Sequence, residues 1–296
     1  MLIQCPSCDA NGTDDLSVCT SCGFVATQIE GFEAWAPELA SGSYGEFFDP
    51  EKFKQLATFE NANFWFQARN KLILWALKNY FGSPTRFAEI GCGTGFVLDA
   101  VKKALPDSEV VGTELFVKGL KFAEQRCGQV KLVQLDARKI PFRQYFDVIG
   151  IFDVLEHIEE DTVVLAQIAK ALLPGGGLLI TVPQHKWLWS PVDEAACHVR
   201  RYSDSELQSK VVAAGFEIVH NTSFVSFLLP AMLCARLGPR RHLVDSVTEL
   251  GLNKYLNWMF GCVMAAECLL IRCGVDFAVG GSRLLVARKI VDDPFQ

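Results

Sequence analysis

The sequence lacks two features that would each indicate a function class: an excess of positive charge and a long uncharged apolar run. Its 296 residues hold 28 Lys+Arg against 34 Asp+Glu, a formal net charge of −6. That balance disfavours nonspecific nucleic-acid binding, which needs a basic surface to neutralise phosphates, although it does not exclude a local basic patch. No stretch reaches the ~18 uncharged apolar residues expected of a membrane-spanning helix.

The N-terminal residues also lack the basic stretch and following apolar stretch that mark a secretory signal. The chain has 11 cysteines. Without a signal, these predict a reducing, cytoplasmic location, where cysteine pairs bind metal more often than they form disulfides. Disorder is excluded because 50% of the residues are hydrophobic and 21% are charged. The length suits one large α/β domain, alone or with a small appendage.

Four of the cysteines lie close together near the N-terminus, as Cys5, Cys8, Cys19 and Cys22. The two-residue gap within each pair lets both thiolates reach one ion, and two such pairs complete a tetrahedral sulfur site that zinc accepts. A closed four-cysteine site has no open position, which indicates a structural ion supplying most of the folding energy of so short a segment. The alternative is a redox dithiol. We predict a zinc ribbon over residues 1–30.

Residues 31–49 are mostly small and polar, and we expect a linker there. A helical, aromatic-rich stretch is expected from about Pro50 to Tyr80, where apolar residues recur at helical spacing. From residue 86 onward, short apolar strands alternate with helices, which predicts a parallel sheet covered on both faces. The predicted strands are 86–91, 109–115, 130–136, 146–152, 177–182, 216–225 and 282–289. The predicted helices between them are 96–105, 118–127, 161–173 and 203–214. The fold class is therefore α/β, with a Rossmann-like, doubly wound sheet in a domain over residues 50–296. A helical insertion is predicted between the last two strands, at about 226–281.

A glycine-rich loop, Gly-Cys-Gly-Thr-Gly at 91–95, joins the first of these strands to a helix. Its glycines let the backbone turn tightly and approach a ligand at a helix N-terminus, which favours a carboxylate or a phosphate. A dinucleotide fingerprint needs its third Gly or Ala at the position that Phe96 occupies, so the loop argues against NAD.

Two acidic residues end the next two strands. Glu114 ends the second strand, where a carboxylate can accept hydrogen bonds from both hydroxyls of a ribose, and Asp136 ends the third, where it can meet an adenine amino group. Taken singly, each acid is explained equally well as a solvated loop residue. The carboxyl ends of successive parallel strands converge on one crevice, so these acids and the glycine loop are expected to line one site.

With these motifs, the chain resembles the class I S-adenosylmethionine-dependent methyltransferases over roughly residues 50–290. Three further runs carry the resemblance: Phe146-Asp147-Val148-Ile149, Asp153-Val154-Leu155-Glu156-His157 and Leu173-Pro174-Gly175-Gly176-Gly177. The resemblance implies a seven-stranded sheet in which 282–289 is the antiparallel strand. It also implies that the loop glycines lie along the methionine part of the cofactor, that Glu114 holds the ribose and that Asp136 lies at the adenine end. The cofactor-binding residues carried over are Glu89, Gly91, Cys92, Gly93, Gly95, Glu114, Leu115, Asp136, Ala137 and Asp153.

The chemistry of such an enzyme is an in-line displacement at a sulfonium methyl, to which the protein contributes positioning and desolvation. A hydroxyl acceptor also calls for a general base, and the candidates after the fifth strand are His185 and His198. Similar bacterial methyltransferases carry a His-x-Arg-Arg-Tyr run after a Trp-rich loop, as at 198–202 here. The alternative is that His198, Arg200 and Arg201 only tie this loop to acidic partners.

The run Asp153-x-x-Glu156-His157 has two interpretations. In ubiquinone-type O-methyltransferases a comparable run holds a divalent ion near the acceptor oxygens, and oxygen-rich ligation suits Mg2+. The alternative is that Glu156 and His157 cap or pack at the start of a helix.

The insertion at 226–281 is apolar, and Arg236, Arg240 and Arg241 flank the first apolar run within it. Apolar helices with a basic edge can cap a substrate pocket, lie in a membrane interface on the inner face of the membrane, or form a homodimer contact. The first two suit a greasy acceptor.

The sequence therefore predicts an S-adenosylmethionine-dependent methyltransferase that acts on a small-molecule or lipid-like acceptor, at oxygen. One alternative is an rRNA or tRNA methyltransferase with a zinc module, against which the net charge and the apolar insertion argue. The other is a non-catalytic scaffold that keeps the fold, against which the complete set of glycines and acids argues.

Overall fold

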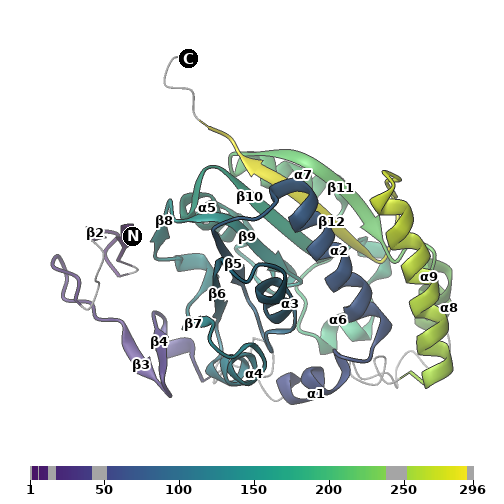
Figure 1. The fold of residues 1–296 in the computed structure, drawn as a ribbon, viewed down its shortest axis with the longest axis horizontal. Coiled ribbons are helices and arrows are strands. Elements are labelled where there is room, and N and C mark those ends of the chain that lie inside the picture. Colours follow the sequence, from purple (N-terminus) through teal and green to yellow (C-terminus); the bar gives the residue numbers. More distant parts are fainter. Residues whose placement is uncertain (1, 6, 13–17, 42–51, 238–251, 292–296) are drawn as a thin grey trace.

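The computed structural model describes residues 2–5, 7–12, 18–41, 52–237 and 252–291, and its centre is one sheet (Figure 1). The strand order is β11-β12-β10-β9-β5-β6-β7-β4-β3. The seven strands predicted from the sequence are β5 (Arg86–Ile90), β6 (Glu109–Glu114), β7 (Lys131–Gln134), β9 (Phe146–Phe152), β10 (Leu172–Pro183), β11 (Phe216–Phe224) and β12 (Ser282–Lys289). As predicted, β12 runs antiparallel, to both β10 and β11.

Helices cover both faces of the sheet because successive strand residues point to opposite sides. In β5, Phe87 packs under α2 (Phe64–Phe81), α3 (Phe96–Ala104) and α4 (Val117–Cys127). Its neighbour Ala88 belongs to the opposite core, under α5 (Asp161–Ala171) and α7 (Asp204–Ala213). Every strand of the parallel set is therefore buried on both sides, as the predicted doubly covered sheet requires.

Two further strands extend the sheet beyond β7, in a segment where the sequence indicated the end of a ribbon and a linker. In that segment, β3 (Thr27–Ile29) and β4 (Phe32–Ala34) form a hairpin, and β4 pairs in parallel with β7. Gln134, which is buried, fixes the edge by accepting from the Ala36 amide at 3.0 Å and donating to the Ala36 carbonyl at 2.8 Å. Strands of three residues have no readable period, so the sequence analysis placed them outside the sheet. Residues 42–49 of the predicted linker lie outside the described residues.

The N-terminal segment attaches to the main domain by a small sheet of its own. Strand β1 (Leu2–Gln4) pairs with β2 (Asn11–Gly12) on one side and with β8 (Phe142–Arg143) on the other. The two cysteine knuckles lie beside this sheet, on the same side of the molecule as β3 and β4 (Figure 1).

The helical stretch expected from residue 50 is two helices. The first, α1 (Lys52–Phe59), ends before Asn63, whose side chain accepts a hydrogen bond from the Trp65 amide and so begins α2. An N-cap of this kind satisfies an amide that the first turn leaves unpaired. Pro50, where the predicted stretch starts, lies outside the described residues.

The insertion contains α8 (Leu229–Leu237) and α9 (Lys254–Arg272). Helix α9 lies against α2 at the edge of the molecule (Figure 1). By length and composition it could cross a membrane, although a buried glutamate, Glu267, interrupts it. Arg240 and Arg241 lie outside the described residues.

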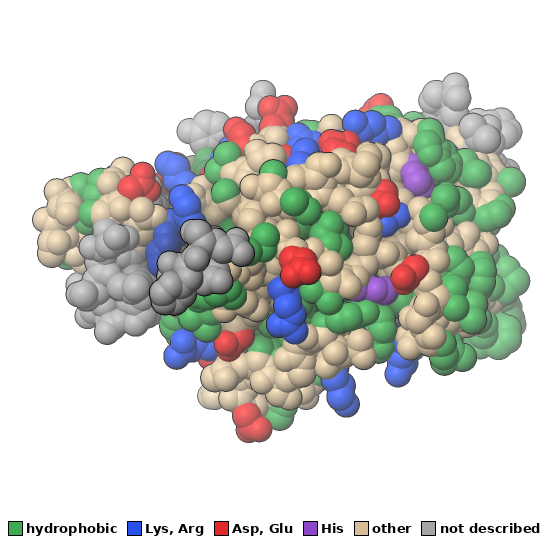
Figure 2. Space-filling model, turned by 90° about the horizontal axis from the view of Figure 1, so that it is seen from above, with side chains coloured by type: hydrophobic (Ala, Val, Ile, Leu, Met, Phe, Trp, Pro, Cys, Tyr) green, Lys and Arg blue, Asp and Glu red, His purple; other side chains and the backbone are tan. Residues whose placement is uncertain are grey.

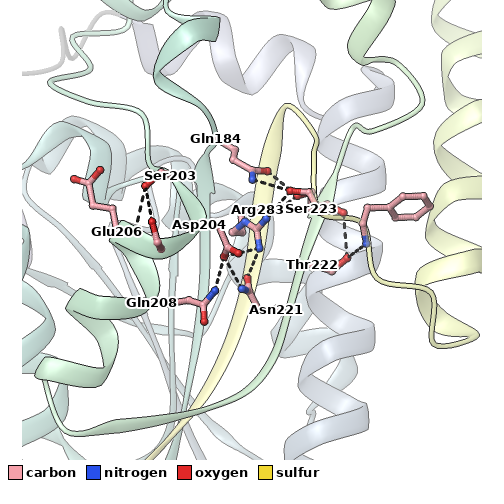
Figure 3. A network of polar contacts seen from close by, with 12 residues as sticks. Gln184, Ser203, Asp204, Glu206, Gln208, Asn221, Thr222, Ser223 and Arg283 are labelled. Atoms are coloured by element: carbon pink, nitrogen blue, oxygen red, sulfur yellow. Dashed lines mark hydrogen bonds and ion pairs between the residues drawn. The ribbon is translucent and has the colours of Figure 1, made fainter.

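A polar network holds the strand ends that border the site (Figure 3). Its centre is Arg283 of β12, which is 2% exposed and donates to Asn221, Ser223 and the Ala278 carbonyl. Asp204, the first residue of α7, pairs with the same guanidinium at 2.8 Å. Burial lowers the pKa of Arg283. The network ties β11, β12 and the start of α7 into one unit beside the carboxyl end of β10.

Candidate active site

A cavity of about 830 Å³ opens at the carboxyl ends of β5, β6, β7 and β9. Gly91 and Gly93 of the glycine loop and the two acids predicted at strand ends line it, whereas Gly95 is not among the lining residues. It also extends under α8 and α9. The site is therefore one continuous space in which a polar half and an apolar half meet.

The backbone of the glycine loop forms the floor of the polar half. Gly91, Gly93 and Gly95 have φ angles of 71°, 52° and 76°, values that residues with a Cβ rarely adopt. A Cβ on Gly91 would lie 2.5 Å from Cγ2 of Val154, so that position has no room for one. Gly95 is the N-cap of α3, which directs the positive end of that helix at the cavity.

Glu114, the last residue of β6, is fixed from two sides. Its Oε2 accepts from the Gly93 amide at 3.0 Å, and its Oε1 accepts from the Phe116 amide at 3.1 Å. Burial raises the pKa of this carboxyl, and these backbone bonds oppose the shift. Leu115 follows it and also lines the cavity.

Asp136 follows β7 and faces the same space, with Ala137 beside it. Its carboxylate is held in a fork by Arg138, whose Nε and Nη2 donate at 3.0 and 2.8 Å. The sequence analysis did not include this arginine, because only the turn after Asp136 brings the Arg138 side chain back to the carboxylate.

Asp153, after β9, is engaged by a residue that the sequence analysis also missed. Arg69 of α2 forms an ion pair with Asp153, and Thr181 donates to the same carboxylate oxygen at 2.9 Å. The Arg69 guanidinium also lies 4.7 Å from the centre of the Trp65 ring. The only sequence signal was the aromatic-rich helix itself, whose placement over the cavity depends on the tertiary fold.

Glu89 of β5 lies beneath the loop and is 3% exposed. Among the described residues, its Oε2 has no hydrogen-bond partner. Burial raises its pKa well above 4.5. Cys92, inside the loop, is buried as well and lines the same space.

Another set of contacts that the sequence analysis did not predict holds α1 against the glycine loop. Glu60, which follows α1, accepts a hydrogen bond from the Thr94 hydroxyl at 2.6–2.7 Å and pairs with Arg126 of α4 at 2.6 Å. Phe53 of α1 packs against Phe116 with ring centres 6.4 Å apart. Helix α1 is thereby held over the glycine loop.

The two candidate bases occupy different places. His198 lines the cavity, and its Nδ1 lies 2.9 Å from Oδ1 of Asp193. Arg201 donates to the same oxygen at 2.7 Å, and Asp193 is fully buried, with a pKa lowered to about 2 despite that burial by His198 and Arg201. His185 is not among the residues that line the cavity, and its ring stacks on Trp187 instead. The ion pair of Arg201 with Asp193 is of the kind expected if this loop is tied to acidic partners, the alternative given in the sequence analysis.

Glu156, His157 and His198 come together at the side of the cavity, with ligand atoms within 4.8 Å of one another. Glu156 is buried, and its Oε1 lies 4.0 Å from Nε2 of His198. Two imidazoles and one carboxylate are a donor set for transition metals more than for Mg2+, which favours oxygen ligands. Mg2+ at this place stays a prediction of the sequence.

The comparisons with known proteins agree with this geometry. Residues 88–178 match the family model of a methyltransferase domain. The chain is 32% identical over 103 residues to the ubiquinone/menaquinone biosynthesis C-methyltransferase of Stutzerimonas stutzeri, covering 32% of this chain and 40% of that protein. It is 29% identical over 159 residues to the ubiquinone biosynthesis O-methyltransferase of Bordetella bronchiseptica, covering 50% and 57%.

Residues 88–178 therefore form a class I S-adenosylmethionine-dependent methyltransferase domain. The chain's matches span 40% and 57% of the length of those two relatives. A solved structure of the [4+2]-cyclase SpnF superposes with a TM-score of 0.51 at 20% identity, covering 77% of this chain and 83% of that one. Because that neighbour is named as a cyclase, this likeness shows the fold alone.

In this methyltransferase, the N-terminal cysteines have the geometry of a metal site. The Cys5 and Cys22 sulfurs lie 3.7 Å apart, as do those of Cys8 and Cys19. A tetrahedral zinc with bonds of about 2.3 Å needs sulfurs about 3.8 Å apart. The cluster therefore fits a structural zinc.

The apolar half of the methyltransferase cavity is built from the insertion. Leu228 and Met232 come from α8 and the turn before it, and Leu256 and Phe260 come from α9. These side chains line the same cavity as Glu114 and Asp136 at the strand ends. The structure thus places part of the 226–281 segment at the site.

Proposed function

We propose that this methyltransferase transfers a methyl group from S-adenosylmethionine to a hydroxyl of a small-molecule or lipid-like acceptor. One observation carries the proposal: a single cavity joins the glycine loop and Glu114 to an apolar wall formed by Leu228, Met232 and Phe260. A polar cofactor and a greasy acceptor need such adjacent environments.

The residues around the loop fit the cofactor piece by piece. Gly91 lines the cavity with a positive φ and no side chain, so the backbone there can lie close to the methionine part. Arg69, beside Asp153, offers a cation for the methionine carboxylate, and the unpartnered Oε2 of Glu89 is an acceptor beneath the loop. Glu114 holds the ribose hydroxyls, and Asp136 lies toward the adenine.

When bound, S-adenosylmethionine supplies a methyl group already activated on a sulfonium. The protein's share is then orientation and exclusion of water. Helix α1, held by the contact of Glu60 with Thr94, covers the loop side. Leu228, Leu256 and Phe260 keep the acceptor side dry.

The geometry around His198 favours oxygen as the methylated atom. His198 lines the cavity, and if its Nδ1 donates a proton to Asp193, Nε2 is the acceptor nitrogen of the ring, which is the arrangement of a base held by an orienting carboxylate. Glu156, whose pKa is raised well above 4.5 by burial, lies beside it. His198 is thus proposed as the base that takes the hydroxyl proton, with Asp193 as its positioning residue. His185, outside the cavity, has no part in the proposal.

We also propose that the protein works in the cytoplasm, at or near the inner face of the membrane, where a lipid-like acceptor would lie. An rRNA or tRNA acceptor remains the second enzyme hypothesis, since the ribbon could hold nucleic acid, but the net charge of −6 and the apolar wall favour the first.

The test begins with calorimetry of S-adenosylmethionine binding and continues with methyl-labelled cofactor. The purified chain is incubated with a panel of hydroxylated aromatics, a bacterial lipid extract and bulk RNA, and the labelled fraction is identified. Label in a hydroxylated aromatic or in the lipid extract supports the proposal. The variant His198→Asn should then lower kcat without changing the Kd for the cofactor. Label in RNA selects the second hypothesis. Absence of cofactor binding would leave a scaffold protein.

A further inference from the structure

The outer face of α9 is an uncharged stripe that no other described element covers. Tyr255 and Trp258 are 74% and 71% exposed, and Leu269 is 60% exposed near the other end. The exposed residues of this face are Tyr255, Trp258, Met259, Cys262, Ala265, Ala266, Leu269, Leu270 and Cys273. They recur at helical spacing over about 27 Å, at 1.5 Å per residue. We call this face the α9 stripe.

Hydrophobic side chains gather at the end of the molecule where α8 and α9 lie (Figure 2). Soluble surfaces rarely keep so long an apolar strip free of charge. The acidic residue of α9, Glu267, is fully buried and accepts a hydrogen bond from the Phe227 amide at 2.7 Å. Because this carboxylate is buried on the inner side of α9, it adds no charge to the exposed stripe.

Cations border the stripe at both ends. Lys254 begins α9 and Arg272 ends it, both are exposed, and their spacing along the helix puts them on one flank of the stripe. Lys71 of α2 and Arg272 both act on the pKa of Cys268, which places Lys71 near the Arg272 end. A surface that pairs an apolar strip with flanking cations complements an anionic lipid interface.

We propose that the α9 stripe docks this protein on the surface of an anionic lipid bilayer, with α9 lying in the plane of the interface. Tyr255 and Trp258 lie at the level where the apolar chains meet the headgroups, as amphipathic rings prefer. Lys254 and Arg272 contact lipid phosphates from one flank.

Two other roles for the same helix fit the structure less well. A membrane-spanning role would have to expose Glu267 and break the packing of Met264 and Ile271, which are fully buried against α2. A second copy of the protein could cover the stripe by packing its own α9 antiparallel to this one, stripe against stripe. That arrangement places Lys254 of one copy against Arg272 of the other, a contact between like charges.

The inner side of the same helix connects the stripe to the active site, a step that rests on the proposed function. Leu256 and Phe260 line the cavity, while Tyr255 and Trp258 point outward from the same turns. An amphiphilic acceptor held in the bilayer would thus meet the apolar half of the cavity one helix diameter from the lipid. The acceptor class implied is a membrane lipid or lipid-soluble molecule with a hydroxyl near its headgroup end.

The experiment is co-sedimentation of the full chain with two kinds of vesicle. One contains phosphatidylcholine alone and the other contains phosphatidylcholine with phosphatidylglycerol. We expect binding to the phosphatidylglycerol vesicles that weakens as salt rises. The double variant Tyr255→Ser/Trp258→Ser should weaken this binding at least about tenfold. Lys254→Gln/Arg272→Gln should remove the preference for phosphatidylglycerol.

The matched control is Val212→Ser on α7, which is 53% exposed and lies on the opposite face of the sheet. It should bind vesicles as the unaltered protein does. Equal loss in this control, or no vesicle binding by the unaltered protein, would overturn the proposal. So would a dimer in sedimentation equilibrium that Trp258→Ser dissociates, because the stripe would then be a contact between copies.

Calorimetry of S-adenosylmethionine on the same samples separates the two proposals. A protein that binds the cofactor but no vesicle contradicts the docking surface alone. A protein that binds vesicles but not the cofactor contradicts the proposed function and leaves the docking surface standing.

Discussion

The Gly93 amide donates a hydrogen bond to Oε2 of Glu114 at 3.0 Å, joining the loop after β5 to the end of β6. The bond spans two elements that the sequence presents separately. It fixes one oxygen of the carboxylate while a lone pair stays available to a ligand, so the loop and the proposed ribose-binding acid form one preorganised unit.

This unit predicts the effect of removing the charge. Glu114→Gln keeps the shape of the side chain and loses a charge-assisted acceptor worth about 1.5–3 kcal/mol. We expect calorimetry to show S-adenosylmethionine binding weakened at least about tenfold, with a melting temperature close to that of the unaltered protein. An unchanged Kd would place the ribose elsewhere.

The same carboxyl predicts a pH dependence. Because the pKa of Glu114 is raised above 4.5 by burial, protonation begins at a higher pH than for an exposed glutamate. Protonation removes an acceptor, so cofactor affinity should fall as the pH is lowered from neutral toward that raised value. In Glu114→Gln this part of the pH dependence should disappear. Parallel pH profiles for the two proteins would contradict the assignment.

Gly95→Ala tests the steric limit of the loop. An added Cβ would lie 2.8 Å from Sγ of Cys127 and 2.9 Å from Cα of Ala123, at a φ of 76°. Since one of these neighbours is backbone, the loop must shift, which we expect to cost about 2 kcal/mol and most of the cofactor affinity. The control is Gly261→Ala in α9, whose Cβ would have only an ordinary contact at 3.8 Å. It should stabilise the helix by up to about 1 kcal/mol, as thermal unfolding can show.

The cysteine cluster predicts one zinc per chain. Cys5→Ser should release the metal in protein purified without chelator and disorder the ribbon, while S-adenosylmethionine binding is retained. Cys273→Ser, a change at an exposed cysteine outside the cluster, should leave the zinc content unchanged. Metal analysis that finds no zinc in the unaltered protein would refute the site.

Asp193 predicts a stability effect remote from the cofactor. Asp193→Asn leaves the guanidinium of Arg201, 5% exposed, without its carboxylate, and we expect a loss of about 3 kcal/mol in denaturant unfolding. The folded pKa is about 2, below the ordinary 3.8, so the carboxylate stabilises the fold above pH 3.8. That contribution is lost as the pH falls through 2, and Asp193→Asn should not show this loss. A variant as stable as the unaltered protein would show that Arg201 has another partner.

Local sequence determined most of the fold. Apolar runs bounded by turns located β5, β6, β9 and β12 to within a residue or so, because strands buried on both faces must be apolar throughout. The glycine loop and Glu114 were visible for a related reason, since a backbone with positive φ demands glycine and a strand end demands a turn. The cysteine spacing was equally local.

Only the tertiary structure decided which distant residues meet. Arg69 reaches Asp153 and Glu60 reaches Thr94 because α1 and α2 fold back over the sheet, and no periodicity in either helix encodes that approach. The same holds for His198, which the fold brings to the cavity while it leaves His185 outside. Helix α9 could be read as apolar from its sequence, but which of its faces is exposed depends on its packing against α2. Contacts between elements depend on the whole arrangement of the chain, and so they could not be read from any one segment.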